Sequence, residues 1–202
     1  LVVSHVGATA IMVPIAISLA LAVAQFVWGA IQPVAGAIAD RHGPRPVLIG
    51  ALVLLALGSA LTPFMSSGPG LVLTIGLVSA MGSGAASFSV LIGAAAQRMP
   101  VEARGTASGV INAGGSFGQF LFAPILQKLI QSIGWMGAMG AMAIAALAAL
   151  PLIGKLTQSS TPPIAHTDTD HGVLRAVRDA LGDRSYLLLH AGFFTCGFHI
   201  AF

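Results

Sequence analysis

The chain has 202 residues, of which 56% are hydrophobic and only 7% are charged, and its formal net charge is +3. A soluble domain contains about 25% charged residues, so this composition excludes an ordinary water-soluble fold. The single cysteine, Cys196, excludes a disulfide framework and a cysteine metal site. The basic excess does not indicate nucleic-acid binding, because the basic residues stand in short segments between apolar runs, where lipid headgroups are the expected counter-charge.

Long uncharged stretches predict an all-α integral membrane protein. A charge at the centre of a membrane helix costs about 2.5 to 3.5 kcal/mol on insertion scales, and about 20 apolar residues span a bilayer. In chain order, the predicted crossings are residues 15–39, 47–65, 71–96, 105–127 and 135–154, and another begins at 186–202. Pro14 is expected to separate the first crossing from residues 1–13, a predicted helix remnant or outer loop.

The charged residues between the crossings predict the orientation. Asp40, Arg41, His42 and Arg45 are expected in a loop, residues 66–70 in a turn, and Lys128 in a loop on the opposite side. If the crossings alternate, eight of the nine Lys and Arg residues share one side, which the positive-inside rule makes cytoplasmic. These eight are Arg41, Arg45, Arg98, Arg104, Lys155, Arg175, Arg178 and Arg184.

The sequence thus predicts a multi-pass protein of the cell membrane, or of the inner membrane in a bacterium. It begins at Leu1 rather than Met and ends within an apolar run, so we expect a fragment. No charged region precedes the first apolar run, so we expect no signal peptide.

Residues 155–184 are the longest polar segment and the expected cytoplasmic linker. Residues 159–163 are predicted to be irregular. Val173, Leu174, Val177 and Leu181 recur at helical spacing with charged residues between them, which predicts an amphipathic helix. This helix could lie on the inner leaflet or form a solvated linker, and both readings stay open.

Small residues predict close packing between the helices. Helices in lipid gain little from hydrophobic burial against one another, so contacts through Gly, Ala and Ser matter more. Four repeats of small residues carry this prediction: Gly76, Ala80 and Gly84; Gly105 and Gly109; Gly114 and Gly118; and Gly137, Ala141 and Ala145.

The most specific stretch is residues 36–46, GAIADRHGPRP. Asp40 stands at a predicted helix end whose dipole disfavours an anion, so it should have a cation or another helix N-terminus as its partner. Gly43 and Pro44 predict the turn, and Pro46 suits the first turn of the next helix. Gly36, one helical turn before Asp40, would let another helix approach closely.

This stretch resembles the loop between helices two and three of the major facilitator superfamily, G-x-x-x-D-R-x-G-R-[RK]. The chain matches at Gly36, Asp40, Arg41, Gly43 and Arg45 and departs at Pro46. The resemblance implies twelve helices in two halves, with 1–154 as an N-terminal bundle whose helix one is truncated, 155–184 as the central loop and 185–202 as helix seven. It also implies that Asp40 and its neighbours control gating, with Arg98 and Arg104 as candidate partners.

Further stretches are similar to the monocarboxylate transporter and oxalate/formate antiporter branch: residues 25–29 with 32–33, residues 114–120 and residues 196–199. The resemblance implies a monomeric secondary transporter that moves an organic monocarboxylate or similar metabolite by alternating access, without a cofactor. A coupled proton or counter-anion stays open. Another substrate class, such as drugs or sugars, is the alternative, although the Gly-Pro signature of drug antiporters is missing from helix five.

Polar residues in the crossings that should face the central cavity are the candidate substrate contacts. They are Gln25, Trp28, Gln32, Ser83, Ser87, Asn112, Ser116, Gln119 and His199. Each could instead only form hydrogen bonds between helices. His190 and His199 are nine residues apart and point to opposite faces, and His199 is the preferred cavity residue.

Two site readings and one broader class compete with the carrier. Residues 114–118 match G-x-S-x-G, so Ser116 with a histidine could form an intramembrane serine protease, but neither helix-seven histidine has an evident orienting partner. His166, Asp168, Asp170 and His171 could bind a metal, but their Thr- and Pro-rich surroundings favour a solvated loop. A channel or membrane scaffold would share the hydropathy without needing the loop at Asp40. We therefore predict a transporter, with no catalytic residue and no metal.

Overall fold

The computed structural model of the chain describes residues 2–96, 99–157 and 173–201. All regular elements in these ranges are helices, which confirms the all-α prediction. The chain divides into two compact units, Leu1–Pro163 and Ile164–Phe202. The division falls inside the polar segment 155–184.

The first helix, α1 (Val2–His42), is longer than predicted. It continues through Pro14 and Pro33, so the expected break at Pro14 is wrong. Proline removes one backbone hydrogen bond, but membrane helices tolerate it because side chains and local adjustments compensate for the freed carbonyl. The apolar residues on both sides of Pro14 favour one helix over a break.

The helix α2 (Pro44–Leu61) and the 3₁₀ turn η1 (Thr62–Phe64) form the second crossing. Buried Thr62 donates its hydroxyl hydrogen to the Gly58 carbonyl at 2.6 Å, which satisfies the side chain inside the helix end. Ser67 then caps the following helix, because its Oγ accepts a hydrogen bond from the Gly70 N–H at 3.3 Å.

The third crossing is interrupted. It consists of α3 (Gly68–Leu71), the π-helix η2 (Val72–Ser79), α4 (Ala80–Ala85) and α5 (Phe88–Ala96). Ala86 and Ser87 separate α4 from α5, so the predicted continuous helix over 71–96 is wrong at this point. A π-helix has i→i+5 backbone hydrogen bonds and a wider turn than an α-helix.

The helix α6 (Val101–Ala148) contains two crossings, because Gly134 has φ 75° and ψ 170° and reverses the chain. After Ala149, α7 (Leu150–Thr157) continues the second of them. The predicted crossings 105–127 and 135–154 are therefore confirmed. The chain reverses at the last residue of the predicted connection 128–134, where glycine accommodates the positive φ, whereas Lys128 itself lies within the helix and not in a loop.

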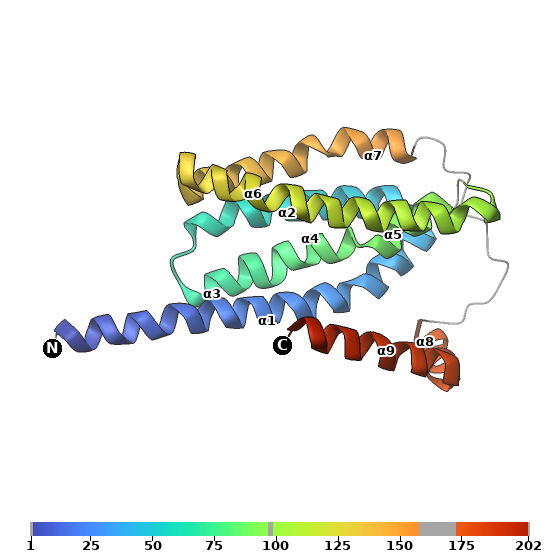
Figure 1. Cartoon of the computed structure of the whole chain (residues 1–202), viewed down its shortest axis with the longest axis horizontal. Coiled ribbons are helices and arrows are strands. Elements are labelled where there is room, and N and C mark those ends of the chain that lie inside the picture. The colour runs from blue at the N-terminus through green and yellow to red at the C-terminus, as the bar shows by residue number, and fades with distance from the viewer. Residues whose placement is uncertain (1, 97–98, 158–172, 202) are drawn as a thin grey trace. The chain divides into compact units, whose positions relative to one another are not determined.

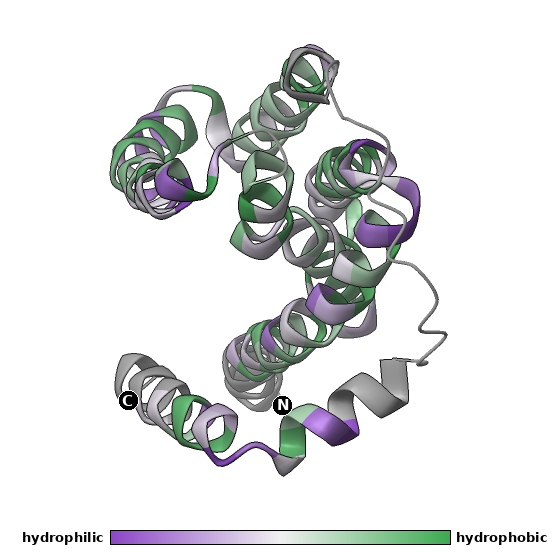
Figure 2. Cartoon of the chain, turned by 90° about the vertical axis from the view of Figure 1, so that its right-hand side faces the viewer, coloured by the Kyte–Doolittle hydropathy of each residue, from purple (hydrophilic) through white to green (hydrophobic). Residues whose placement is uncertain are grey.

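Four stretches are long and apolar enough to cross a membrane: Pro14–His42, Pro44–Phe64, Gly68–Ala96 and Val101–Gly154. Figure 1 shows the ribbons of this unit running back and forth side by side, and the last stretch doubles back on itself in yellow. The α1–α2 turn, the start of α6 and the end of α7 consequently lie at one end of the unit. Figure 2 looks at this end, where hydrophilic ribbon lies in the turns and the helices behind are mostly pale or green.

Glycines of the third crossing set the helix spacing. A Cβ on Gly84 would lie 2.7 Å from the Trp28 carbonyl oxygen of α1, and one on Gly82 would lie 2.8 Å from the Ala51 carbonyl oxygen of α2. Gly76 packs against Val23 of α1, and Ala80 is buried. The repeat Gly76, Ala80 and Gly84 is thereby confirmed as a packing surface. The predicted contacts of four other glycines are not made within the described chain, where a Cβ would meet open space: Gly105, Gly109, Gly114 and Gly118.

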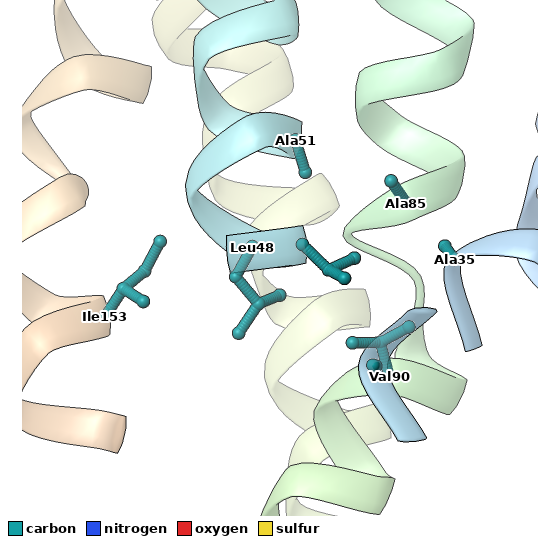
Figure 3. Packing of buried hydrophobic residues seen from close by; sticks show 8 residues of the cluster. Ala35, Leu48, Ala51, Ala85, Val90 and Ile153 are labelled. Carbon is teal, nitrogen blue, oxygen red and sulfur yellow. The ribbon is translucent and has the colours of Figure 1, made fainter. Parts of the chain in front are cut away.

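A buried cluster fixes the helices at the end that carries the α1–α2 turn. Figure 3 shows Ala35, Leu48 and Val90 converging from α1, α2 and α5, with Ile153 of α7 beside them. Half of the eight buried residues in this cluster are alanines, whose small side chains let the helix backbones approach closely. The cluster therefore packs together the helix ends of α1 and α2 on both sides of Gly43.

The second unit contains α8 (Val173–Gly182) and α9 (Arg184–Ala201), which contact each other. The predicted amphipathic helix is thus confirmed as a helix, and its place on a leaflet stays a prediction. Asp183 alone links the two helices, and its Oδ1 accepts a hydrogen bond from the Ser185 N–H at 2.8 Å. This side chain caps the start of α9.

Candidate gating turn and substrate path

The turn between α1 and α2 consists of Gly43 alone, whose φ of 81° favours glycine. Asp40, Arg41 and His42 belong to the last turn of α1, so the predicted loop is shorter than expected. Pro44 occupies the first position of α2, where its missing N–H costs no hydrogen bond, and Pro46 lies in the same turn, as predicted. The four charged or ionisable side chains Asp40, Arg41, His42 and Arg45 are all exposed.

Asp40 borders a cavity of about 230 Å³ between α1, α2 and α5. Its other lining residues are Gly36, Ala39, Pro44, Ser89, Val90, Gly93 and Ala94. A Cβ on Gly36 or Gly93 would meet open space, so no helix of the described chain makes the close approach predicted at Gly36. Asp40 thus borders a cavity next to two glycines without side chains, and this cavity leaves space for another group to approach.

The predicted cationic partners of Asp40 do not contact it in the described residues. Arg98 lies outside them. Arg104 is exposed near the start of α6, where its Nε donates a hydrogen bond to the Met99 carbonyl at 3.4 Å. The pairing of Asp40 with either arginine therefore stays a prediction.

The serines of the third crossing form local hydrogen bonds. Half-buried Ser83 donates to the Ala80 carbonyl at 3.1 Å, and buried Ser87 shares a hydrogen bond of 2.8 Å with Ser89. A Cβ on Gly58 of α2 would collide with Ser79 Oγ, so Ser79 faces α2. Ser87 lies in the interruption between α4 and α5, a feature that the sequence did not reveal.

Three polar residues share one face of α6 in the part before Gly134. Asn112, Ser116 and Gln119 are exposed, and the Asn112 amide donates to the Ser108 carbonyl at 3.0 Å. On α1, Gln25 and Trp28 are exposed and Gln32 is half-buried. Exposed amides in an apolar crossing require water or a polar partner, because unsatisfied polar groups cost several kcal/mol in hydrocarbon.

In α9, His190 is exposed, and its ring centroid lies 4.4 Å from that of Tyr186. His199 belongs to the same helix, but its side chain is outside the described part. The predicted metal cluster His166, Asp168, Asp170 and His171 also falls outside the described residues, which themselves hold no group of three or more His, Cys, Asp or Glu side chains.

Phe88, the first residue after the interruption, packs its ring on the Cα of Gly115 in α6. We predict that Gly115→Val displaces this ring and destabilises the protein by about 1–3 kcal/mol, the usual cost of overpacking. Gly114→Val is the matched control, since a Cβ at Gly114 meets open space. Thermal unfolding of both variants in detergent measures the difference, and equal midpoints would contradict this packing.

The family model of the Major Facilitator Superfamily matches residues 3–202. The chain belongs to this superfamily. Its membership confirms the predicted family and a multi-pass membrane protein of the transporter class, and it argues against an enzyme. The helix interruption and the turn at Gly43 are thus features of a member of this superfamily.

Relatives among characterised proteins support the monocarboxylate branch. The chain is 36% identical to monocarboxylate transporter 13 of Rattus norvegicus over 119 residues, which are 58% of this chain and 26% of that protein. It is 35% identical to monocarboxylate transporter 11 of Homo sapiens over 118 residues, 58% of this chain and 24% of the relative. The chain is also 29% identical to the fujikurins efflux protein of Gibberella fujikuroi over 110 residues, which are 54% of this chain and 23% of that protein. The matched part therefore spans about a quarter of each relative.

Proposed function

We propose that the protein is a secondary transporter that moves a small organic monocarboxylate or similar metabolite by alternating access. The observation that carries the proposal is the interruption at Ala86–Ser87 within a membrane crossing. Non-helical backbone at membrane depth is tolerated where protein buries it or where it borders a water-filled cavity, and transporters use such breaks at substrate sites. The N-terminus of α5 supplies a partial positive charge there, which suits a carboxylate.

Two further features support this proposal. The exposed polar face of Asn112, Ser116 and Gln119 suits a hydrated path, and Gln25, Trp28 and Gln32 would border it from α1. The names of the two monocarboxylate transporters favour an organic anion as substrate. His199 is the proposed proton-accepting group if transport is coupled to protons, because an imidazole can take up and release a proton near neutral pH.

Efflux of a larger metabolite is the second candidate. The similarity to the fujikurins efflux protein favours it, although the identity is lower than that to the monocarboxylate transporters. The fold and the gating turn would serve either substrate class, so the choice depends on the side chains along the path.

Transport in proteoliposomes tests the proposal. We expect saturable uptake of a radiolabelled short-chain monocarboxylate, accelerated when the vesicles contain unlabelled monocarboxylate. An uptake rate that rises linearly with concentration and does not change when the vesicles contain unlabelled monocarboxylate would indicate a channel instead. Export of an added aromatic metabolite without monocarboxylate uptake would favour the second candidate.

We also infer that the end carrying Arg45 and Arg104 faces the cytoplasm. Single cysteines placed at 45, 104 and 128 in a chain with Cys196→Ser test this orientation. An impermeant maleimide applied to intact cells should label position 128 and spare 45 and 104, because the reversal near Gly134 lies at the far end of the unit. Labelling of 45 and 104 from opposite sides would overturn the topology.

A further inference from the structure

An apolar groove of about 340 Å³ lies between α2, α5 and α7. Its lining consists of Leu48, Leu52, Ala86, Leu91, Ala149, Leu152 and Ile153, without a polar side chain. The volume lies at the lower end of the range for ligand pockets, about 300–1,000 Å³. The groove is thus large enough for a ligand and chemically suited to hydrocarbon.

The lining residues of the groove on α2, Leu48 and Leu52, are one helical turn apart. The helix α2 leads away from the α1–α2 turn, whereas α5 and α7 lead back toward that end. Leu48, Leu91 and Ile153 therefore lie near the membrane surface, and Ala86 and Ala149 lie deeper. Figure 3 shows Leu48 and Ile153 on the neighbouring helices α2 and α7. A chain that follows this groove would lie parallel to the acyl chains of the bilayer.

The basic residue Arg45 lies on α2 one turn before Leu48, toward the shallow end of the groove. Arg45 precedes Leu48 by three residues and Leu52 by seven, so all three share one face of α2. The opposite face of α2, with Val47, Ala51 and others, lines a separate apolar groove of about 250 Å³ against α1 and α4. Arg45 is exposed and lines neither groove, and its helical position places it nearer the face of Leu48 and Leu52 than the face of Val47 and Ala51.

We propose that this groove binds a phospholipid, with an acyl chain between α2, α5 and α7 and an anionic headgroup on Arg45. Arginine recognises phosphate through two parallel hydrogen bonds. Neither Asp nor Glu is among the lining residues, so nothing in the groove repels the phosphate. Asp40 borders the different cavity between α1, α2 and α5. The site is independent of the transported substrate.

Photolabelling of the purified protein in phosphatidylcholine nanodiscs tests the proposal. The probe is phosphatidylglycerol with a diazirine on one acyl chain, and the labelled residues are mapped by mass spectrometry. We expect label on residues 48–52 and 149–153, and competition by unlabelled phosphatidylglycerol but not by phosphatidylcholine. If the groove of about 250 Å³ between α1, α2 and α4 is labelled equally, or if both lipids compete equally, the labelling reflects non-specific lipid contact and the proposal is overturned.

Two pairs of variants sharpen the test. Arg45→Gln should lower the groove labelling about fivefold, the loss expected for one arginine near the membrane surface, while Lys128→Gln leaves it unchanged. Ala149→Phe should fill the groove and prevent labelling, while Ala60→Phe, at an exposed position of α2, should not. Should Ala149→Phe fail to elute as folded protein, the arginine pair decides alone. Undiminished labelling of Arg45→Gln rejects the headgroup site.

Discussion

Gly84→Val is expected to leave little folded protein, because Gly84 is where α4 crosses α1 most tightly. A Cβ at this position would lie 2.7 Å from the Trp28 carbonyl oxygen and would also collide with Ile31 Cγ2. A backbone carbonyl cannot move aside as a flexible side chain can, so the two helices must separate. Overpacking in a well-packed core costs about 1–3 kcal/mol and occasionally more, and we place this variant at or above about 3 kcal/mol.

The matched control is Gly109→Val in α6, where a Cβ meets open space. Both variants lose the same backbone freedom and gain the same side chain, so a difference between them reports the helix contact alone. Size-exclusion chromatography of fluorescently tagged variants measures the folded fraction. A folded peak for Gly84→Val equal to that of Gly109→Val would show that α1 and α4 do not pack as described.

Spacing alone predicted the packing surface on the third crossing but not its partners. Gly76 and Gly84 of the repeat face α1 and Ala80 between them is buried, as small residues in lipid should be. The repeats in α6 have the same spacing, yet Gly105 and Gly118 meet no neighbour in the described chain. A spacing rule identifies a surface that permits close approach, whereas the presence of a second helix depends on the tertiary arrangement.

The interruption at Ala86–Ser87 was beyond the reach of local signals. Neither residue is Pro or Gly, and the whole stretch 71–96 is apolar enough for one helix. The break is held instead by contacts from other elements, since Phe88 packs on Gly115 and Ala85 and Val90 belong to the buried cluster. Local propensity gave no warning because tertiary packing decides the conformation here.

The two turns, at Gly43 and Gly134, also differ in how well the sequence predicted them. Gly43 was predicted because its neighbours Pro44 and Asp40 give strong turn and helix-end signals. The turn at Gly134 falls within the predicted connection, but Lys128 was wrongly placed in a loop, because a lysine near a helix end can extend its side chain to the membrane surface. The candidate site shows both outcomes: the α1–α2 turn forms as the motif predicts, while the proposed substrate contacts depend on side-chain surroundings that spacing does not encode.

Asp40→Asn is expected to lower the transport rate about tenfold or more while leaving membrane insertion and substrate affinity largely unchanged. Asp40 is exposed, lines a cavity bordered by the bare backbone of Gly36 and Gly93, and has no ion pair among the described residues. Its partner would therefore engage in one of the alternating states only. A contact made in one state shifts the equilibrium between the states by its own free energy, and couplings of about 1–3 kcal/mol change populations 5- to 150-fold.

The measurement separates gating from binding and from folding. Initial uptake rates in proteoliposomes should fall for Asp40→Asn, while substrate protection against thermal unfolding keeps its concentration dependence. Asp179→Asn, an exposed carboxylate of α8, removes the same charge elsewhere and should transport normally. A variant that loses its folded peak would assign Asp40 a structural role, and one that binds substrate more weakly at an unchanged maximal rate would place it in the substrate site. A slow rate with intact folding and affinity is specific to a residue that stabilises one state of the cycle.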